Sequence, residues 1–178
     1  MLYENFNFYK IIIIIISYLL GSISGSMIIG KIKGVDIRNL GSGNAGGTNA
    51  FRTQGTLFAL AVIIIDILKG YIAVYYISGD YGQVSLEGII CGIAAVLGHV
   101  YPIYYSFNGG KGAGTLVGIL MALYPLGLLI GFIVWLLVLI LSGYVGLSTI
   151  IAGVSFPLTI YYNNYHGGID SILGFFSI

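Results

Sequence analysis

The sequence has 178 residues, of which 58% are hydrophobic and only 7% are charged. A soluble domain carries about 25% charged residues, so 7 Lys and Arg with 6 Asp and Glu are too few to cover a soluble surface of this size. The net charge of +1 also excludes a basic nucleic-acid-binding protein. A mean hydropathy of +1.00 agrees with the remaining class, an integral membrane protein.

Apolar runs separated by polar links predict an all-α fold with about seven transmembrane helices in a single domain over residues 1–178. The first run is too long for a signal peptide and is expected to stay in the membrane as one helix. The last run is shorter than the roughly 17–25 residues that a span needs, and is expected to be a truncated seventh helix. The predicted helices lie at about residues 11–29, 57–77, 88–105, 116–123, 128–141, 147–162 and 169–178.

The positive charges are concentrated in two Gly-rich polar segments. Residues 31–55 carry four Lys or Arg residues and residues 106–115 carry one, whereas the links at 78–87 and 163–168 carry none. Because cytoplasmic loops are enriched in Lys and Arg, both Gly-rich segments are predicted to be cytoplasmic and the N-terminus to lie outside.

The first Gly-rich segment contains the run S-G-N-A-G-G-T-N-A-F-R over residues 42–52. Glycine-rich backbone can point successive N–H groups into one anion-binding concavity, and an arginine adds a forked charge suited to phosphate. The segment therefore predicts an anion site. Its candidate residues are Ser42, Gly43, Asn44, Thr48, Asn49 and Arg52.

The second Gly-rich segment, G-G-K-G-A-G-T over residues 109–115, leads into a predicted helix. A helix N-terminus favours anions, and Lys111 adds a point charge. The Walker A spacing is not met, so nucleotide binding is not implied. Two such segments on one membrane face indicate a ligand with two phosphates or two phosphorylated ligands. The candidates here are Gly109, Gly110, Lys111, Gly112 and Thr115.

Asp66, Lys69 and His99 fall inside predicted helices. Asp66 and Lys69 are three residues apart and share a helix face, so we expect a structural ion pair. His99 lies just before the second Gly-rich segment and is a further candidate for the site. The sequence contains no G-x-S-x-G motif and no cluster of metal-ligand residues. An enzyme of this composition must orient and polarise a substrate that is already activated.

These motifs together resemble the bacterial acyl-phosphate–glycerol-3-phosphate acyltransferases, the PlsY family. The resemblance runs from the first helix to about residue 160. It rests on Gly41-Ser42-Gly43-Asn44 with Gly46, Thr48-Asn49 and Arg52, on Asp66-Ile67-Leu68-Lys69-Gly70, on Gly98-His99 with Pro102, and on Gly109-Gly110-Lys111-Gly112 with Thr115.

The resemblance implies a plasma-membrane enzyme with a cytoplasmic active site that uses no metal and no cofactor. Its reaction transfers a fatty acyl group from acyl-phosphate to the 1-hydroxyl of glycerol 3-phosphate, which is the first acylation of phospholipid biosynthesis. Lys111 and Arg52 would be catalytic, with Lys111 stabilising the leaving phosphate, and the other candidates, His99 among them, would bind substrate. Which segment holds which phosphate stays open.

The resemblance also implies a short H-R-x-N-I-like motif after the last helix, whereas this sequence ends at Ile178 before such a motif. We expect either a fragment or a variant that lacks this part of the site. The alternative function is a membrane phosphate or organic-anion transporter, which would also place Gly-rich anion sites beside a membrane.

Overall fold

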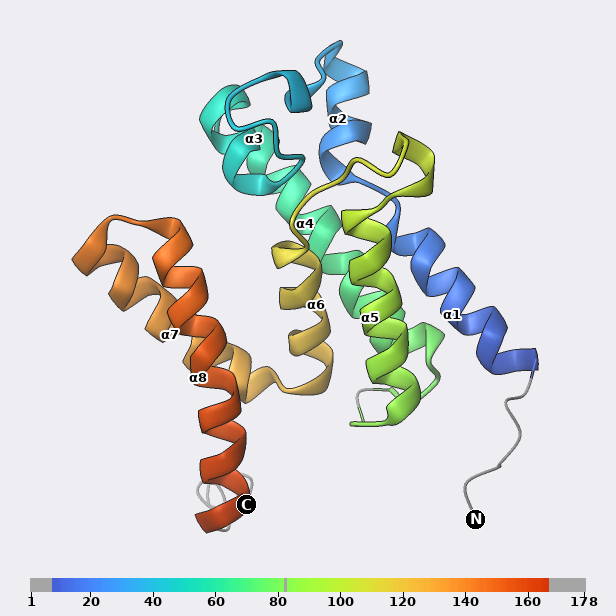
Figure 1. Cartoon of the computed structure of the whole chain (residues 1–178), viewed down its shortest axis with the longest axis vertical. Coiled ribbons are helices and arrows are strands. Elements are labelled where there is room, and N and C mark those ends of the chain that lie inside the picture. Colours follow the sequence, from blue (N-terminus) through green and yellow to red (C-terminus); the bar gives the residue numbers. More distant parts are fainter. Residues whose placement is uncertain (1–7, 82, 167–178) are drawn as a thin grey trace. The chain divides into compact units, whose positions relative to one another are not determined.

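The computed structural model describes residues 8–81 and 83–166, and the residues described form helices joined by turns, with no strand (Figure 1). Contacts divide the chain into two compact units, Met1–Leu123 and Tyr124–Ile178. Five described segments are long and apolar enough to cross a membrane. The single domain over residues 1–178 and the span count of about seven stay predictions, and the predicted helix at 169–178 lies outside the described residues.

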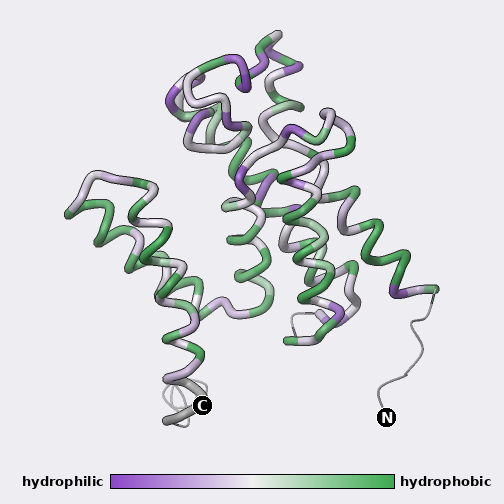
Figure 2. The backbone as a smooth tube through the Cα atoms, viewed as in Figure 1, coloured by the Kyte–Doolittle hydropathy of each residue, from purple (hydrophilic) through white to green (hydrophobic). Residues whose placement is uncertain are grey.

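The described residues of the first unit form six α-helices and three short turns of other helix types. The α-helices are α1 (Phe8–Gly21), α2 (Gly25–Lys33), α3 (Gly47–Gln54), α4 (Thr56–Ile72), α5 (Leu86–Val100) and α6 (Ala113–Leu123). The shorter elements are the 3-10 turns η1 (Ile37–Asn39) and η3 (Ile103–Tyr105) and the π-helical turn η2 (Ala73–Ile77). Figure 2 shows hydrophilic backbone gathered around α3 and the segment that leads into α6, beyond the ends of apolar helices.

The first predicted span is not one continuous helix. It is interrupted between α1 and α2, at residues 22–24, within the sequence Gly21-Ser22-Ile23-Ser24-Gly25. Small and glycine residues lower the cost of leaving helical geometry there, and the freed Ile23 carbonyl accepts a hydrogen bond from Lys69 Nζ at 2.7 Å. The predicted span at 11–29 lies within Phe8–Lys33, which is long and apolar enough to cross a membrane, but it is built from two helices instead of one.

Glycines at the helix contacts set how closely the helices pack. An added Cβ at Gly98 of α5 would meet the backbone of α1 at Tyr18 and Gly21, and one at Gly118 of α6 would meet the backbone of α4 at Ile67 and Tyr71. Small residues allow such close approach between helices in membranes. Consequently α1 packs along α5, and α4 packs along α6.

The described residues of the second unit form a helical hairpin of α7 (Pro125–Ser142) and α8 (Val145–His166). Gly143, with φ +73, lies in the turn between them. Pro125 occupies the first turn of α7, where a missing N–H costs nothing. The predicted interruption of the apolar stretch near Pro125 is thus confirmed, while α6, at 11 residues, is shorter than a full span.

Candidate functional site

The first Gly-rich segment is not an open loop. It makes turns at Gly41 (φ +58) and Gly43 (φ +73) and then enters α3, so the polar link expected at 31–55 contains a helix. The side chain of Asn49 holds this arrangement together and is only 1% exposed. Its Oδ1 accepts the Ser42 N–H at 2.9 Å, and its Nδ2 donates to the carbonyls of Ile37 and Leu40, both at 3.0 Å.

Those three bonds use both donors of the Asn49 amide. The geometry therefore shows the Asn49 side chain holding the turn. Ser42, Thr48 and Arg52 have exposed side chains, and Asn44 is half-buried. The first helical bond of α3 runs from Ala50 N–H to Gly46 O, and no side chain caps the helix. The first N–H groups of α3 are consequently free of helical acceptors.

An apolar cluster anchors this segment to the membrane helices. Ile37 of η1 and Ala50 of α3 are fully buried against Phe58, Ala59 and Val62 of α4. Burying apolar surface is the main stabilising term available to such short elements. The turns that carry the exposed polar groups are therefore fixed on α4.

The second Gly-rich segment folds back on the end of α5. Gly109 N–H donates to Val100 O at 3.2 Å, and Gly110 N–H donates to His99 O at 3.1 Å. An added Cβ at Gly110 would meet His99 Nε2, so only glycine fits against the imidazole. Gly112 turns the chain with φ +82 into α6, and Lys111 stays exposed. Thr115, by contrast, is fully buried within α6, beside Gly70 of α4.

Three buried ionisable side chains lie beneath the second segment. Lys69 Nζ is 3.1 Å from Asp66 Oδ1 and 2.7 Å from His99 Nδ1, and all three residues are at most 3% exposed. The ion pair that the spacing of Asp66 and Lys69 indicated is thus present. Because Lys69 also donates to Ile23 O, the cluster ties the break after α1 to α4 and to the end of α5.

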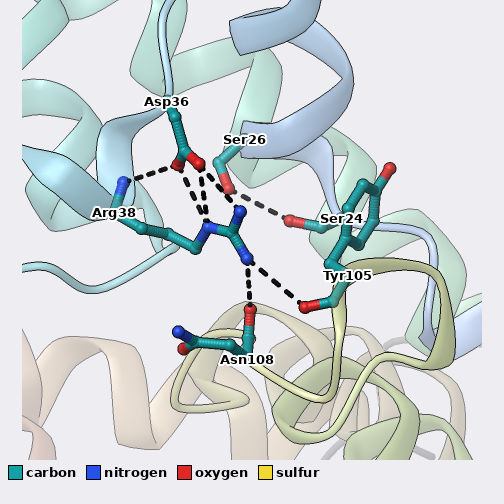
Figure 3. Close-up of polar contacts among 6 residues, drawn as sticks. All are labelled: Ser24, Ser26, Asp36, Arg38, Tyr105 and Asn108. Carbon is teal, nitrogen blue, oxygen red and sulfur yellow. Dashed lines mark hydrogen bonds and ion pairs between the residues drawn. The ribbon is translucent and has the colours of Figure 1, made fainter.

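Arg38 joins the two Gly-rich segments through a contact that sequence reasoning missed (Figure 3). Its guanidinium forms a forked ion pair with Asp36, with Nη2 2.7 Å from Oδ2 and Nε 3.0 Å from Oδ1. Its Nη1 donates across to the carbonyls of Tyr105, at 3.3 Å, and Asn108, at 3.4 Å. We call this set of contacts the Arg38 bridge. The signal in the sequence was an acid two residues before an arginine, just ahead of the first glycine turn.

The Arg38 bridge is charged across the ordinary pH range. The hydrogen bonds and charge of Arg38 lower the pKa of the Asp36 carboxyl below its usual 3.8, and the hydrogen bond from Arg38 to Asp36 raises the pKa of the guanidinium above its ordinary value. A fork of this kind is favoured by the planar geometry of arginine.

The bridge brings the two Gly-rich segments to one end of the first unit. Arg52 and Lys111 are exposed there and form no ion pair with the residues described. Such unpaired cations beside free backbone N–H groups are suited to phosphate. No group of three His, Cys, Asp or Glu side chains that could hold a metal occurs among the described residues.

An apolar groove of about 350 Å³ lies between α5 and α6. Its lining carries no polar surface, and along α6 it begins at Leu116, directly after the second Gly-rich segment. It is lined by Ile89, Gly92, Ile93, Val96, Leu97, Leu116, Ile119 and Leu123. A hydrocarbon chain fits the chemistry of such a surface.

Comparison with known proteins identifies the family. The family model described as glycerol-3-phosphate acyltransferase matches residues 11–178. The chain belongs to the glycerol-3-phosphate acyltransferase (PlsY) family. A glycerol-3-phosphate acyltransferase of Chlorobaculum tepidum is 43% identical over 165 residues, covering 86% of this chain and 71% of the relative. One from Aquifex aeolicus is 40% identical over 153 residues, covering 86% and 80%.

Solved acyltransferase structures share the fold. PlsY (YgiH), described as an integral membrane glycerol 3-phosphate acyltransferase, matches in its glycerol 3-phosphate form with a TM-score of 0.79 and 36% identity, covering 92% of this chain and 81% of that chain. Its lysophosphatidic acid form matches with a TM-score of 0.77 and 34% identity over the same shares. Membership of this family of transferases confirms the sequence resemblance and an integral membrane fold, and favours an acyltransferase over the anion transporter.

Proposed function

We propose that this protein transfers a fatty acyl group from acyl-phosphate to the 1-hydroxyl of glycerol 3-phosphate. The products are lysophosphatidate and inorganic phosphate, and the reaction is the first acylation of phospholipid biosynthesis. The observation that carries the proposal is the meeting of two cationic, Gly-rich segments at one end of the first unit, beside an apolar groove. Membership of the family adds glycerol 3-phosphate as the acceptor.

The chemistry needs no nucleophile from the protein. Acyl-phosphate is a mixed anhydride, so the substrate hydroxyl attacks the carbonyl carbon directly. A new ester C–O bond forms, the C–O bond to phosphate breaks, and phosphate leaves with the electron pair. The hydroxyl proton passes to a phosphate group of the substrates. Positioning and electrostatic stabilisation are then the main contributions required of the enzyme.

The exposed groups of the two segments are proposed to supply those contributions. Lys111 stabilises negative charge on the leaving phosphate, and Arg52 binds phosphate through its fork. The N–H groups and side chains of the first segment, Ser42, Gly43, Asn44 and Thr48, complete the anion sites together with Gly109, Gly110 and Gly112. His99 and Thr115 are buried, so they are proposed to act from inside the helices that carry these segments.

The donor and the location also follow from this proposal. The groove between α5 and α6 would hold the acyl chain with its head at the cationic end, which suits a donor dissolved in the bilayer. A hydrophobic protein with both Gly-rich segments on the cytoplasmic side belongs in the bacterial plasma membrane, with its active site facing the cytoplasm. No cofactor or metal enters the reaction.

A donor comparison tests the proposal. Purified protein in lipid is given glycerol 3-phosphate with palmitoyl-phosphate or palmitoyl-CoA, and lysophosphatidate is measured by mass spectrometry. We expect product from palmitoyl-phosphate alone. If only palmitoyl-CoA gives product, the donor is acyl-CoA and not acyl-phosphate. If neither donor gives product, the proposed acyl transfer is refuted.

A further inference from the structure

We infer that Arg38 is a positioning residue that sets the spacing between the two phosphate-binding segments. The inference rests on the proposed function, because it concerns how the same site is assembled. Arg38 contacts residues 67 and 70 positions later in the chain, and Asn108, the second of these, directly precedes Gly109. The Arg38 bridge therefore ends where the second Gly-rich segment begins.

On its other side, the bridge is connected to the first Gly-rich segment through η1. Arg38 is the middle residue of η1, whose first carbonyl, that of Ile37, accepts from Asn49 Nδ2 at 3.0 Å. Asn49 belongs to α3, which also carries Arg52. Ile37 itself is fully buried. A short, anchored path thus runs from α3 through η1 and the guanidinium to the backbone before Lys111.

The contacts argue against a direct role for Arg38 in phosphate binding. Its charge is already met by the Asp36 carboxylate, and Nε, Nη1 and Nη2 all have protein acceptors. Its side chain is 22% exposed, whereas Arg52 and Lys111 are exposed and unpaired among the described residues. A phosphate would have to compete with the carboxylate to reach Arg38.

Lysine cannot replace arginine in this arrangement. The fork with Asp36 and the two carbonyl bonds need planar donors that diverge from one group, whereas an ammonium is a single point charge. A misplacement of about 1 Å can cost about 100-fold in rate. The inference therefore predicts that Arg38→Lys, which keeps the charge, behaves like Arg38→Gln, which removes it.

Steady-state kinetics with palmitoyl-phosphate and glycerol 3-phosphate test the inference. For Arg38→Lys and Arg38→Gln we expect kcat to fall about 10-fold or more, with each KM within about 3-fold of wild type, because each substrate still has its own segment. Asp36→Asn should also lower kcat. Lys31→Ala removes an exposed charge from α2, and is expected to leave kcat within about 2-fold.

Two results would overturn the inference. If Arg38→Lys keeps wild-type kcat while Arg38→Gln raises a KM, Arg38 acts as a charge that binds substrate. If Asp36→Asn lowers the KM for either phosphorylated substrate, the carboxylate competes with that substrate for Arg38, and Arg38 is a ligand.

Hydrogen exchange measured by mass spectrometry separates the inference from the proposed function, since it needs no turnover. We expect faster exchange of residues 101–112 in Arg38→Lys and no change in Lys31→Ala. Unchanged exchange in Arg38→Lys would refute the bridge even if the enzyme is active. If exchange of residues 101–112 is faster in Arg38→Lys, as expected, but the wild type releases no phosphate in the presence of glycerol 3-phosphate, the proposed function is refuted and the Arg38 bridge is retained.

Discussion

Replacing Lys69 by methionine should destabilise the protein strongly, because it leaves the buried Asp66 carboxylate without its counter-charge. Lys69 is 2% exposed and Asp66 is 3% exposed, and their charged atoms are 3.1 Å apart. Removing one partner of a buried ion pair costs about 3–5 kcal/mol. For a protein of 150–250 residues each kcal/mol lowers Tm by about 2–4 °C, so we expect a fall of roughly 6–20 °C.

The assay is thermal unfolding in one detergent, run as a double-mutant cycle. Asp66→Asn should also destabilise, and Asp66→Asn combined with Lys69→Met should be more stable than the sum of the single changes implies, because neither charge is then left alone. Lys31→Met, on the exposed face of α2, is the matched control and should leave Tm nearly unchanged. A Lys69→Met protein with a Tm within about 2 °C of wild type, a shift of less than about 1 kcal/mol, would show that Lys69 does not stabilise the buried Asp66 carboxylate.

The packing of α6 on α4, the turn held by Asn49 and the charge of Asp36 can each be tested separately. Gly118→Leu should abolish the close contact of α6 with α4 and lower Tm. Gly153→Ala, whose Cβ enters open space, should leave Tm nearly unchanged, and thermal unfolding of both variants checks this. Asn49→Ala should cost about 1–3 kcal/mol and speed proteolysis of residues 37–54, because the Ser42 N–H loses its acceptor and the Ile37 and Leu40 carbonyls each keep only a backbone donor; unchanged proteolysis would contradict the assignment. The folded pKa of Asp36 is depressed, so its contribution is present above the unfolded value of 3.8 and is lost only as pH falls through the lower folded value. The kcat ratio of wild type to Asp36→Asn should therefore stay constant from pH 5 to 9, and a ratio that changes within this window would contradict it.

Much of the fold could be predicted because apolar length alone decides which segments suit a bilayer. The spans near 57–77, 88–105 and 147–162 were located by hydropathy, and Pro125 marked the start of α7. The pairing of Asp66 with Lys69 was readable from their spacing on one helix face. Each of these features depends on residues that are close in sequence.

The remainder depends on partners that are distant in sequence. The break after α1 is stabilised by Lys69, 46 residues later, and a hydropathy profile carries no sign of that bond. Asn49 looked like a substrate ligand because amides suit phosphate, but its burial against η1 directs its amide to the backbone. Arg38 counted only as one positive charge until its contacts with residues 105 and 108 were known.

The two Gly-rich segments are proposed to act together in one acyl transfer. Phosphate release from palmitoyl-phosphate, measured with and without glycerol 3-phosphate for wild type, Lys111→Ala and Lys31→Ala, tests it most directly. We expect phosphate release that depends on glycerol 3-phosphate, that falls about 100-fold in Lys111→Ala and that is kept in Lys31→Ala. Full release in a folded Lys111→Ala protein, or release that ignores glycerol 3-phosphate, would contradict the claim.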